Sequence, residues 1–382
     1  MRRSDLFLPA SRQRRGEGTE ATELLVRAGL VGKFDSGLWA LTPTGERIQE
    51  NVIQHIQAEM GSVGGQEVTL PGLQHRERWE ESGRWQSFGG EMFTLADRGG
   101  RELCLAPSHE EGIVHLLDGL VRSYEELPLT LYQVDSKFRD DHPRGGLLRC
   151  KEFTTKDAYS FHADEASLRE GYRKIRAAYE RLLADLDMKF AVAESANSVM
   201  DGERSEEVVA PVAGGTCALL HCEAVDCRFG LTDESGRPHE VWMGSYGLGV
   251  GGIIQTPVMQ GGAEGGVDAD SADAACHWPV TDWGCVAPYR AAVIPIGDGE
   301  VQDVAEAIHD DFGRDCLLFD SERQSVGERF AESELLGIPA KIIVGNGYRE
   351  TGQVEIETRD GESRAVAVDE VASAVDRFGA GG

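Results

Sequence analysis

Two runs of residues between 131 and 162 constrain the fold more than any other part of the chain, because both alternate in polarity. In the first run one parity is mainly apolar and the other polar: Tyr132, Val134, Ser136 and Phe138 against Gln133, Asp135, Lys137, Arg139 and Asp141. Such a period of two residues predicts a half-buried strand. The second run adds Arg149, Lys151, Asp157 and Tyr159 on one parity. We expect an antiparallel pair whose polar face could receive a polyanion, since the arginine fork can hold two phosphate oxygens.

Short motifs accompany this pair in a defined order. The most specific is KDAYSFH at 156–162, whereas the dipeptide Arg-Asp alone carries no information. The others are LFLP (6–9), RAGLV (27–31), GGQEVTLPGLQ (64–74), WEESGRW (79–85), LAPSHEE (105–111), MGSYGLGVGG (243–252) and LLGIP (335–339). Together they resemble the class II aminoacyl-tRNA synthetases, in the form of the bacterial-type prolyl-tRNA synthetases, over nearly the whole chain. The chain looks like a shortened, divergent copy of haloarchaeal kind.

The resemblance implies an α+β fold in two parts. Residues 1–285 would form the class II catalytic core, an antiparallel sheet flanked by helices, and residues 286–382 an α/β domain similar to anticodon-binding domains. The residues support the second part independently, because strand-like and helical segments alternate there, which predicts a mixed sheet. The strands are expected at AAVIPI (291–296), CLLF, KIIV and VEIE, and the helices at 300–312 and near 327–336 and 368–378.

Two helices are expected in the first part. Residues 43–60 place apolar side chains on one helical stripe, with Thr42 or Thr44 as the cap and Pro43 tolerated at the start. By resemblance, this helix and the strand after it form the first class II motif and a homodimer interface; otherwise it is an ordinary core helix. A second helix follows a cap at Asp164 and covers about 165–187. Residues 260–275 are rich in Gly and Asp and predict a mobile loop.

Amino-acid activation joins a carboxylate to the α-phosphate of ATP, so phosphate charge must be neutralised and the carboxylate held in line. The resemblance assigns catalysis to Arg139 and Arg149. It assigns ATP binding to these two arginines with Asp141, Gly247 and Gly249, and it implies that Mg²⁺ accompanies ATP. Proline would be bound by Ser108, Glu110, Asp157, Tyr159 and His162. For an isolated arginine, a surface ion pair is the ordinary alternative.

The segment Ser108–Glu111 has a second interpretation. By resemblance, Ser108 accepts a hydrogen bond and Glu110 pairs with the positively charged nitrogen of proline. The spacing S-x-x-E is also that of a capping box, with Ser108 as N-cap and Glu111 as its partner. His109 would then only be a residue at the helix entry. Capping and substrate binding do not exclude each other.

The sequence departs from the family's pattern mainly in the catalytic machinery. Gly252 stands where the third class II motif has an arginine that braces the γ-phosphate, and the loop HPRGG offers Gly145 or Gly146 in place of an aromatic residue that stacks on adenine. The family's editing insertion is absent. A strand that walls the proline pocket is also expected to be lost between Glu194 and Glu240, and whether residues 217–227 replace it is left open.

Net charge is −28, which argues against a nucleic-acid partner unless the acidic, lysine-poor surface is an adaptation to high salt. We favour the halophilic interpretation. No apolar run approaches the ~20 residues of a membrane span, and the N-terminus lacks an apolar signal core, so a cytoplasmic protein without membrane contact is expected. The cluster Cys217, His221, Cys222 and Cys227 has no standard zinc spacing, so reduced thiols are expected and zinc is not.

Three functions remain open at this point. The first is a ligase that activates proline with ATP and transfers it to tRNA. The second is a catalytically degenerate paralogue that binds proline or tRNA without efficient adenylate formation, which Gly252 favours. The third is a structural dimer unrelated to tRNA, for which only the acidic charge speaks.

Overall fold

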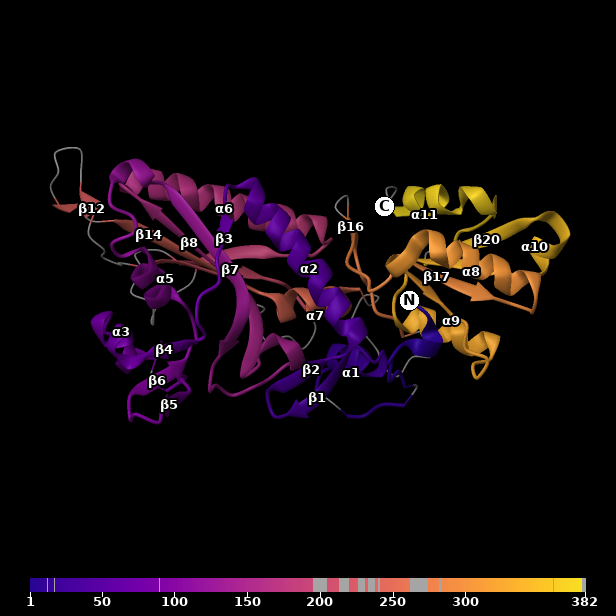
Figure 1. Ribbon diagram of the computed structural model, residues 1–382, viewed down its shortest axis with the longest axis horizontal. Helices are drawn as coiled ribbons and strands as arrows, with labels where there is room; N and C mark the ends of the chain where they lie inside the picture. Colours follow the sequence, from indigo (N-terminus) through magenta and orange to yellow (C-terminus); the bar gives the residue numbers. More distant parts are fainter. Residues whose placement is uncertain are drawn as a thin grey trace.

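A computed structural model describes residues 1–11, 13–16, 18–88, 90–194, 205–212, 220–225, 231–232, 238–239, 241–261, 274–281, 284–359 and 361–379. Most of the loop predicted at 260–275 lies outside these residues, as do Cys217 and Cys227, so the calls on the loop and on the cysteine cluster stay predictions. Figure 1 shows two sheets at opposite ends of an elongated molecule, with α2 and α7 between them.

The larger sheet has the strand order β3-β7-β8-β14-β11-β10-β9. Its centre is the pair predicted from the alternating runs, β7 (Leu129–Phe138) and β8 (Glu152–His162), which are antiparallel. On the far side of β8 lies β14 (Trp242–Gly249). The outer strands are β3 (Gln66–Glu67), β9 (Ala191–Glu194), β10 (Ser205–Val209) and β11 (Leu220–Val225).

The strand β11 corrects one expectation. A strand of the sheet was expected to be lost between Glu194 and Glu240, yet β11 pairs antiparallel with β14 and β10 continues the sheet beyond it. Of the segment 217–227, residues 220–225 therefore form a strand next to β14. The sheet stays continuous because residues 220–225 supply the ladder partners that β14 needs.

Three helices cover one face of this sheet: α2 (Pro43–Ser62), α6 (Glu165–Asp185) and α7 (Val250–Gln260). The predicted caps are confirmed, since Thr42 accepts a hydrogen bond from the backbone of Gly45 and Asp164 accepts one from Ser167. The apolar stripe of α2 is buried in the main core, which supplies the hydrophobic stabilisation of this layer. Its buried members are Ile48, Val52, Ile56 and Met60.

The opposite face of the sheet is covered by a small subdomain (Figure 1). It contains the sheet β4-β6-β5, at Leu73–His75, Glu102–Leu105 and Thr94–Ala96, with helices α3 (Arg76–Glu81), α4 (Arg84–Ser87) and α5 (Glu110–Leu117). Ile113 and Leu117 of α5 are buried in one cluster with Tyr159 and Phe161 of β8. The start of α5 is thereby held against the polar part of β7, β8 and β14.

The second sheet has the order β18-β17-β19-β20-β21. The neighbours of β17 are parallel to it and the remaining pairs are antiparallel, so the predicted mixed sheet is confirmed. Its strands are β17 (Ala291–Pro295), β18 (Cys316–Leu318), β19 (Ala340–Val344), β20 (Gln353–Thr358) and β21 (Ser363–Ala367). Its helices are α8 (Glu300–Phe312), α9 (Val326–Leu335), α10 (Asn346–Thr351) and α11 (Val371–Gly379).

The remaining elements are short. A helix and a hairpin lie near the N-terminus, at α1 (Glu20–Arg27), β1 (Val31–Asp35) and β2 (Leu38–Leu41). Further strands are β12 (Leu231–Thr232), β13 (Pro238–His239), β15 (Val280–Thr281) and β16 (Gly284–Cys285). The 3-10 helices are η1 (Arg3–Asp5), η2 (Tyr124–Glu126), η3 (Gly146–Leu148), η4 (Gly313–Asp315) and η5 (Val368–Glu370).

Candidate active site

The loop between β6 and α5 carries the buried polar residues Ser108 and His109, and Glu110, also buried, is the first residue of α5. The predicted capping box is wrong, because His109, and not Ser108, is the N-cap of α5 and no side chain caps the helix. The Ser108 hydroxyl donates instead to the Glu110 carboxylate. Ser108 therefore does not cap the helix, and its hydroxyl group positions the carboxylate of Glu110.

Glu110 is 3% exposed and accepts hydrogen bonds from three sides. The Ser245 hydroxyl on β14 donates to Oε1 at 2.8 Å, and Nη1 of Arg84 lies 3.2 Å from Oε2; Ser108 is the third donor. Burial alone would raise the pKa of Glu110, but the charge of Arg84 and the hydroxyl donors outweigh it and hold the pKa below its usual range. Glu110 is thus a buried carboxylate that stays ionised.

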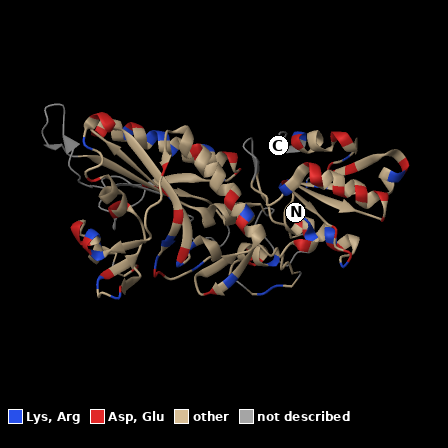
Figure 2. Cartoon of the chain, viewed as in Figure 1, with Lys and Arg blue, Asp and Glu red and all other residues tan. Residues whose placement is uncertain are grey.

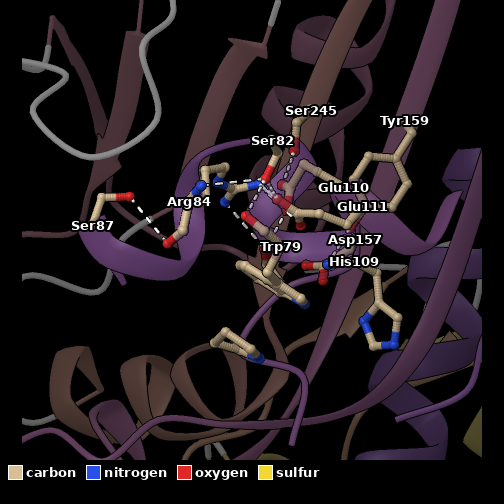
Figure 3. A network of polar contacts seen from close by, with 12 residues as sticks. Trp79, Ser82, Arg84, Ser87, His109, Glu110, Glu111, Asp157, Tyr159 and Ser245 are labelled. Atoms are coloured by element: carbon tan, nitrogen blue, oxygen red, sulfur yellow. Dashed lines mark hydrogen bonds and ion pairs between the residues drawn. The ribbon is translucent and has the colours of Figure 1, made fainter. Parts of the chain in front are cut away.

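Glu111 shares the same guanidinium. Nη1 of Arg84 lies 3.1 Å from Oε1 and 3.3 Å from Oε2 of Glu111, and the Ser82 hydroxyl donates to Oε1 at 2.8 Å. Burial is the largest effect on Glu111 and, with the neighbouring negative charge of Glu110, raises its pKa. Figure 3 shows the two carboxylates converging on Arg84, with Ser82 and Ser245 approaching them from different elements.

Arg84 is the site residue that sequence reasoning missed. It lies at the start of α4, directly after Gly83, whose φ of 74° is the left-handed conformation that glycine adopts without strain. Its guanidinium carbon lies 5.3 Å from the ring centroid of Trp79 and 5.0 Å from that of Phe88. The segment WEESGRW contains this residue, but only the folded chain shows which carboxylates it meets.

The polar face of the sheet lies below this loop. Tyr159 is 1% exposed, and its hydroxyl accepts a hydrogen bond from the backbone of His109 at 3.1 Å. Asp157 forms an ion pair with Lys137, a fully buried lysine, at 3.4 Å. In register, Gly247 lies opposite Asp157 and Gly249 opposite Thr155. A Cβ atom at Gly249 would meet nothing within 4 Å, so this part of the surface has room for a ligand.

Arg139 connects this face to the loop. It follows the end of β7, and its Nε and Nη2 atoms donate to the carbonyl oxygen of Pro107 at 3.3 and 3.2 Å. Its guanidinium carbon lies 5.5 Å from the ring centroid of Phe153. Arg139 is therefore held next to the segment that carries Ser108 and Glu110.

Two further residues predicted to bind ATP, Arg149 and Asp141, bind each other. Arg149 and Asp141 form an ion pair across the two ends of the connection between β7 and β8. The arginine side chain is 40% exposed and the aspartate 19%, so this pair is far more accessible than the one at Glu110.

His162 does not join the predicted proline site. It has the parity opposite to Asp157 and Tyr159, so it faces the helices: its Nδ1 lies 2.8 Å from the Ser167 hydroxyl, and a Cβ atom at Gly171 would clash with its ring. Burial lowers its pKa to about 4, so it is neutral at physiological pH. A histidine packed against α6 cannot contact a ligand on the opposite face, and the assignment to proline binding is withdrawn.

The HPRGG loop is tied to α7. The side chain of Gln255 accepts from the backbone of Leu147 at 2.8 Å and donates to the carbonyl of Gly145 at 2.9 Å. Gly146 has φ of 68°, and a Cβ there would collide with Thr22 and Gln255. An aromatic side chain at 146 is thus excluded by packing. Gly252 lies in the first turn of α7, which contains no arginine.

Among the described residues, none of the helices has the length and apolarity needed to cross a membrane. Across the same part of the chain, no group of three or more His, Cys, Asp or Glu side chains is arranged to hold a metal ion.

Comparison with known proteins agrees with this geometry. Residues 93–260 match the family described as the tRNA synthetase class II core domain (G, H, P, S and T), and residues 290–377 match the anticodon binding domain family. Proline--tRNA ligase of Thermotoga maritima is 39% identical over 239 residues, which are 62% of this chain and 41% of that protein. That of Moorella thermoacetica is 40% identical over 228 residues, 59% of this chain and 40% of that protein.

The alignments thus span about two fifths of the length of the curated relatives. A solved structure, Giardia lamblia prolyl-tRNA synthetase in complex with prolyl-adenylate, superimposes with a TM-score of 0.81 over 94% of this chain and 79% of that one, at 18% sequence identity. This similarity confirms the predicted α+β fold. The chain thus carries a region that matches the class II tRNA synthetase core domain, followed by one that matches the anticodon binding domain.

Proposed function

We propose that the protein activates proline with ATP and transfers it to tRNA. The support comes from the class II core, from relatives named Proline--tRNA ligase, and from a fold shared with a protein solved with prolyl-adenylate. An amino acid in water is a zwitterion, so a site that activates it needs an anion for the ammonium and a cation for the carboxylate.

The observation that carries the proposal is the placement of Glu110 and Arg139 around one loop. Glu110 is an ionised carboxylate at the start of α5, and the guanidinium of Arg139 donates to Pro107 on the loop that leads into this helix. The two opposite charges are therefore fixed by one short segment on one face of the sheet. That arrangement fits the two charged ends of a small amino acid.

The roles follow from position. Glu110, with Ser108 beside it, would hold the secondary ammonium of proline, and Asp157 and Tyr159 would form the floor. Arg139 would hold the carboxylate and the α-phosphate. The ATP side would be completed by Arg149, Asp141, Gly247 and Gly249, with Mg²⁺ arriving on the nucleotide phosphates.

The partners and the setting extend the same proposal. The anticodon binding domain supports tRNA as the second substrate, and the boundary between the two domains is placed near 285/286. Figure 2 marks acidic positions along α8, and the residues Glu300, Asp303, Glu306, Asp310 and Asp311 of this helix are all exposed. We place RNA contacts away from that helix, because it would repel phosphate. We further propose that two copies of the chain form a homodimer through α2, and that the protein is cytoplasmic and adapted to high salt.

Proline-dependent exchange of pyrophosphate into ATP tests the proposal, with the full chain assayed at low and at molar KCl. Exchange that requires proline, and that other amino acids do not support, is the expected result. Absence of exchange at every salt concentration, with proline still bound, would instead establish the degenerate paralogue that Gly252 favours. If neither proline nor tRNA raises the melting temperature, both ideas fail and the structural dimer gains.

A further inference from the structure

Two adjacent buried carboxylates share one guanidinium in this site. Nη1 of Arg84 lies between Glu110 and Glu111, 3.1 to 3.3 Å from three of their oxygens, and all three residues are less than a tenth exposed. A second buried carboxylate next to a singly charged cation is costly unless one of the acids holds a proton. The geometry therefore requires that the two carboxyl groups differ in protonation state.

The hydrogen bonds show which acid is which. Arg84 contacts both acids, so the difference lies in the hydroxyl donors. Glu110 receives two, from Ser108 and Ser245, whereas Glu111 receives one, from Ser82. More donors stabilise the ionised form. Glu110 is thus the ionised partner, and Glu111 is the one that tolerates a proton.

Arg84 is itself fixed in place. The turn at Gly83 directs it inward, the backbone of Arg84 donates to the Ser82 hydroxyl at 3.4 Å, and its guanidinium lies over the rings of Trp79 and Phe88. Trp79 is in turn anchored by a hydrogen bond from its indole nitrogen to Gln74 at 2.7 Å. The guanidinium of Arg84 is therefore held against the two carboxyl groups in a single orientation.

We propose that Arg84 is a positioning residue for the amino-acid substrate: it keeps Glu110 ionised and aimed, while Glu111 takes up the excess charge as a proton. This inference rests on the proposed function and deepens it. Arg84 itself does not need to contact proline. Its effect is on the charge and direction of the carboxylate that does.

The test compares R84M, which keeps the length of the side chain without its charge, with R84K, which keeps the charge without the fork. In the wild type the pKa of Glu110 lies below its usual range, so KM for proline should stay constant as pH falls from about 8 to about 6. In R84M burial is opposed only by the hydroxyl donors Ser108 and Ser245, so the pKa of Glu110 rises. KM at pH 7 should rise by ~30-fold or more, and it should rise further as pH falls.

R84K should recover part of the affinity and most of the flat pH profile. R78M is the matched control, because Arg78 pairs with Glu81 at 3.1 Å on the exposed side of α3. Changes in kcat should be smaller than changes in KM. Circular dichroism and melting curves establish that each variant is folded.

Three outcomes would overturn the inference while leaving the proposed function intact. The first is an unchanged KM for proline in R84M. The second is a raised KM in R84M that is as independent of pH as in the wild type. The third is a rise in KM in R84K as large and as pH-dependent as in R84M. A wild-type chain that neither binds proline nor supports exchange would refute the proposed function itself, so the two failures are distinguishable.

Discussion

The side of the site proposed to bind the amino acid and the side proposed to bind the nucleotide are built differently. Around Glu110 the ionisable groups are nearly inaccessible and each has several partners, as with Arg84, whose side chain is 9% exposed. On the other side, Arg149 is 40% exposed and bound to Asp141, and Gly252 provides no charge. A dense buried network is preorganised and loses much when one member is removed. The comparison teaches that the proposed proline side is a rigid, buried network and that the proposed ATP side has few interdependent charged groups.

The largest effect is expected at the centre of the dense side. E110Q removes the charge that faces the ammonium, while Arg84 keeps the Glu111 carboxyl group as its neighbour. The value of kcat/KM for proline should fall on the order of 10²–10³-fold. E77Q, at an exposed position of α3, is the control. A loss under about threefold in E110Q would show that the dense network does not serve the substrate.

The next effect concerns the residue that connects the two sides. R139K replaces a planar fork by a single ammonium, so contacts of Arg139 with the carboxylate and the phosphate cannot both be kept. We expect kcat/KM to fall by about 10–100-fold for proline and for ATP alike. R169K, whose side chain is 67% exposed on α6, should behave as wild type. A loss confined to one substrate would place Arg139 on one side only.

Binding on the proposed nucleotide side can be strengthened by adding a cation. G252R returns a cation to the first turn of α7, where a charge-assisted contact with a phosphate would lower KM for ATP by about tenfold. KM for proline should change little. G327R puts the same side chain into the first turn of α9, where a Cβ has open space, and tests for a non-specific effect of charge. Equal gains in both variants would mean that added charge, and not the site, is responsible.

The smallest effect is expected from D141N. The pair with Arg149 is partly exposed, and such pairs contribute about 0–1 kcal/mol, so KM for ATP should rise less than about fivefold. D298N, at an exposed position before α8, is the control. A large loss in D141N would contradict the distinction between the two sides, because it would make the nucleotide side as interdependent as the amino-acid side.

Local patterns were enough to predict the scaffold. The alternation of β7 and β8, the caps Thr42 and Asp164, and the second sheet with its helices, apart from β21 and α10, depend on neighbours within a few residues. The helix predicted at 300–312 has those same bounds in the structure. These local sequence patterns predict the elements correctly because the tertiary packing favours the same helices and strands.

The site was less predictable, because it depends on contacts between distant segments. Arg84 meets Glu110 across 26 residues, and nothing in the local sequence marks that pairing. His162 was misassigned although its parity already placed it with Lys156 and away from Asp157. In that case the motif KDAYSFH outweighed a period-two rule that was visible in the same residues. Whether residues 217–227 form a strand was left open, because the alternation of Leu220, Cys222 and Ala224 with His221 and Glu223 is too short to decide it.

The central claim is that the amino-acid side is complete without the nucleotide side. Calorimetric titration of the full chain with proline, in the absence of ATP, tests this most directly. We expect saturable binding by the wild type, the same binding by D141N, and at least ~30-fold weaker binding by E110Q. Proline binding that appears only after ATP is added, or that E110Q retains at full strength, would contradict the account.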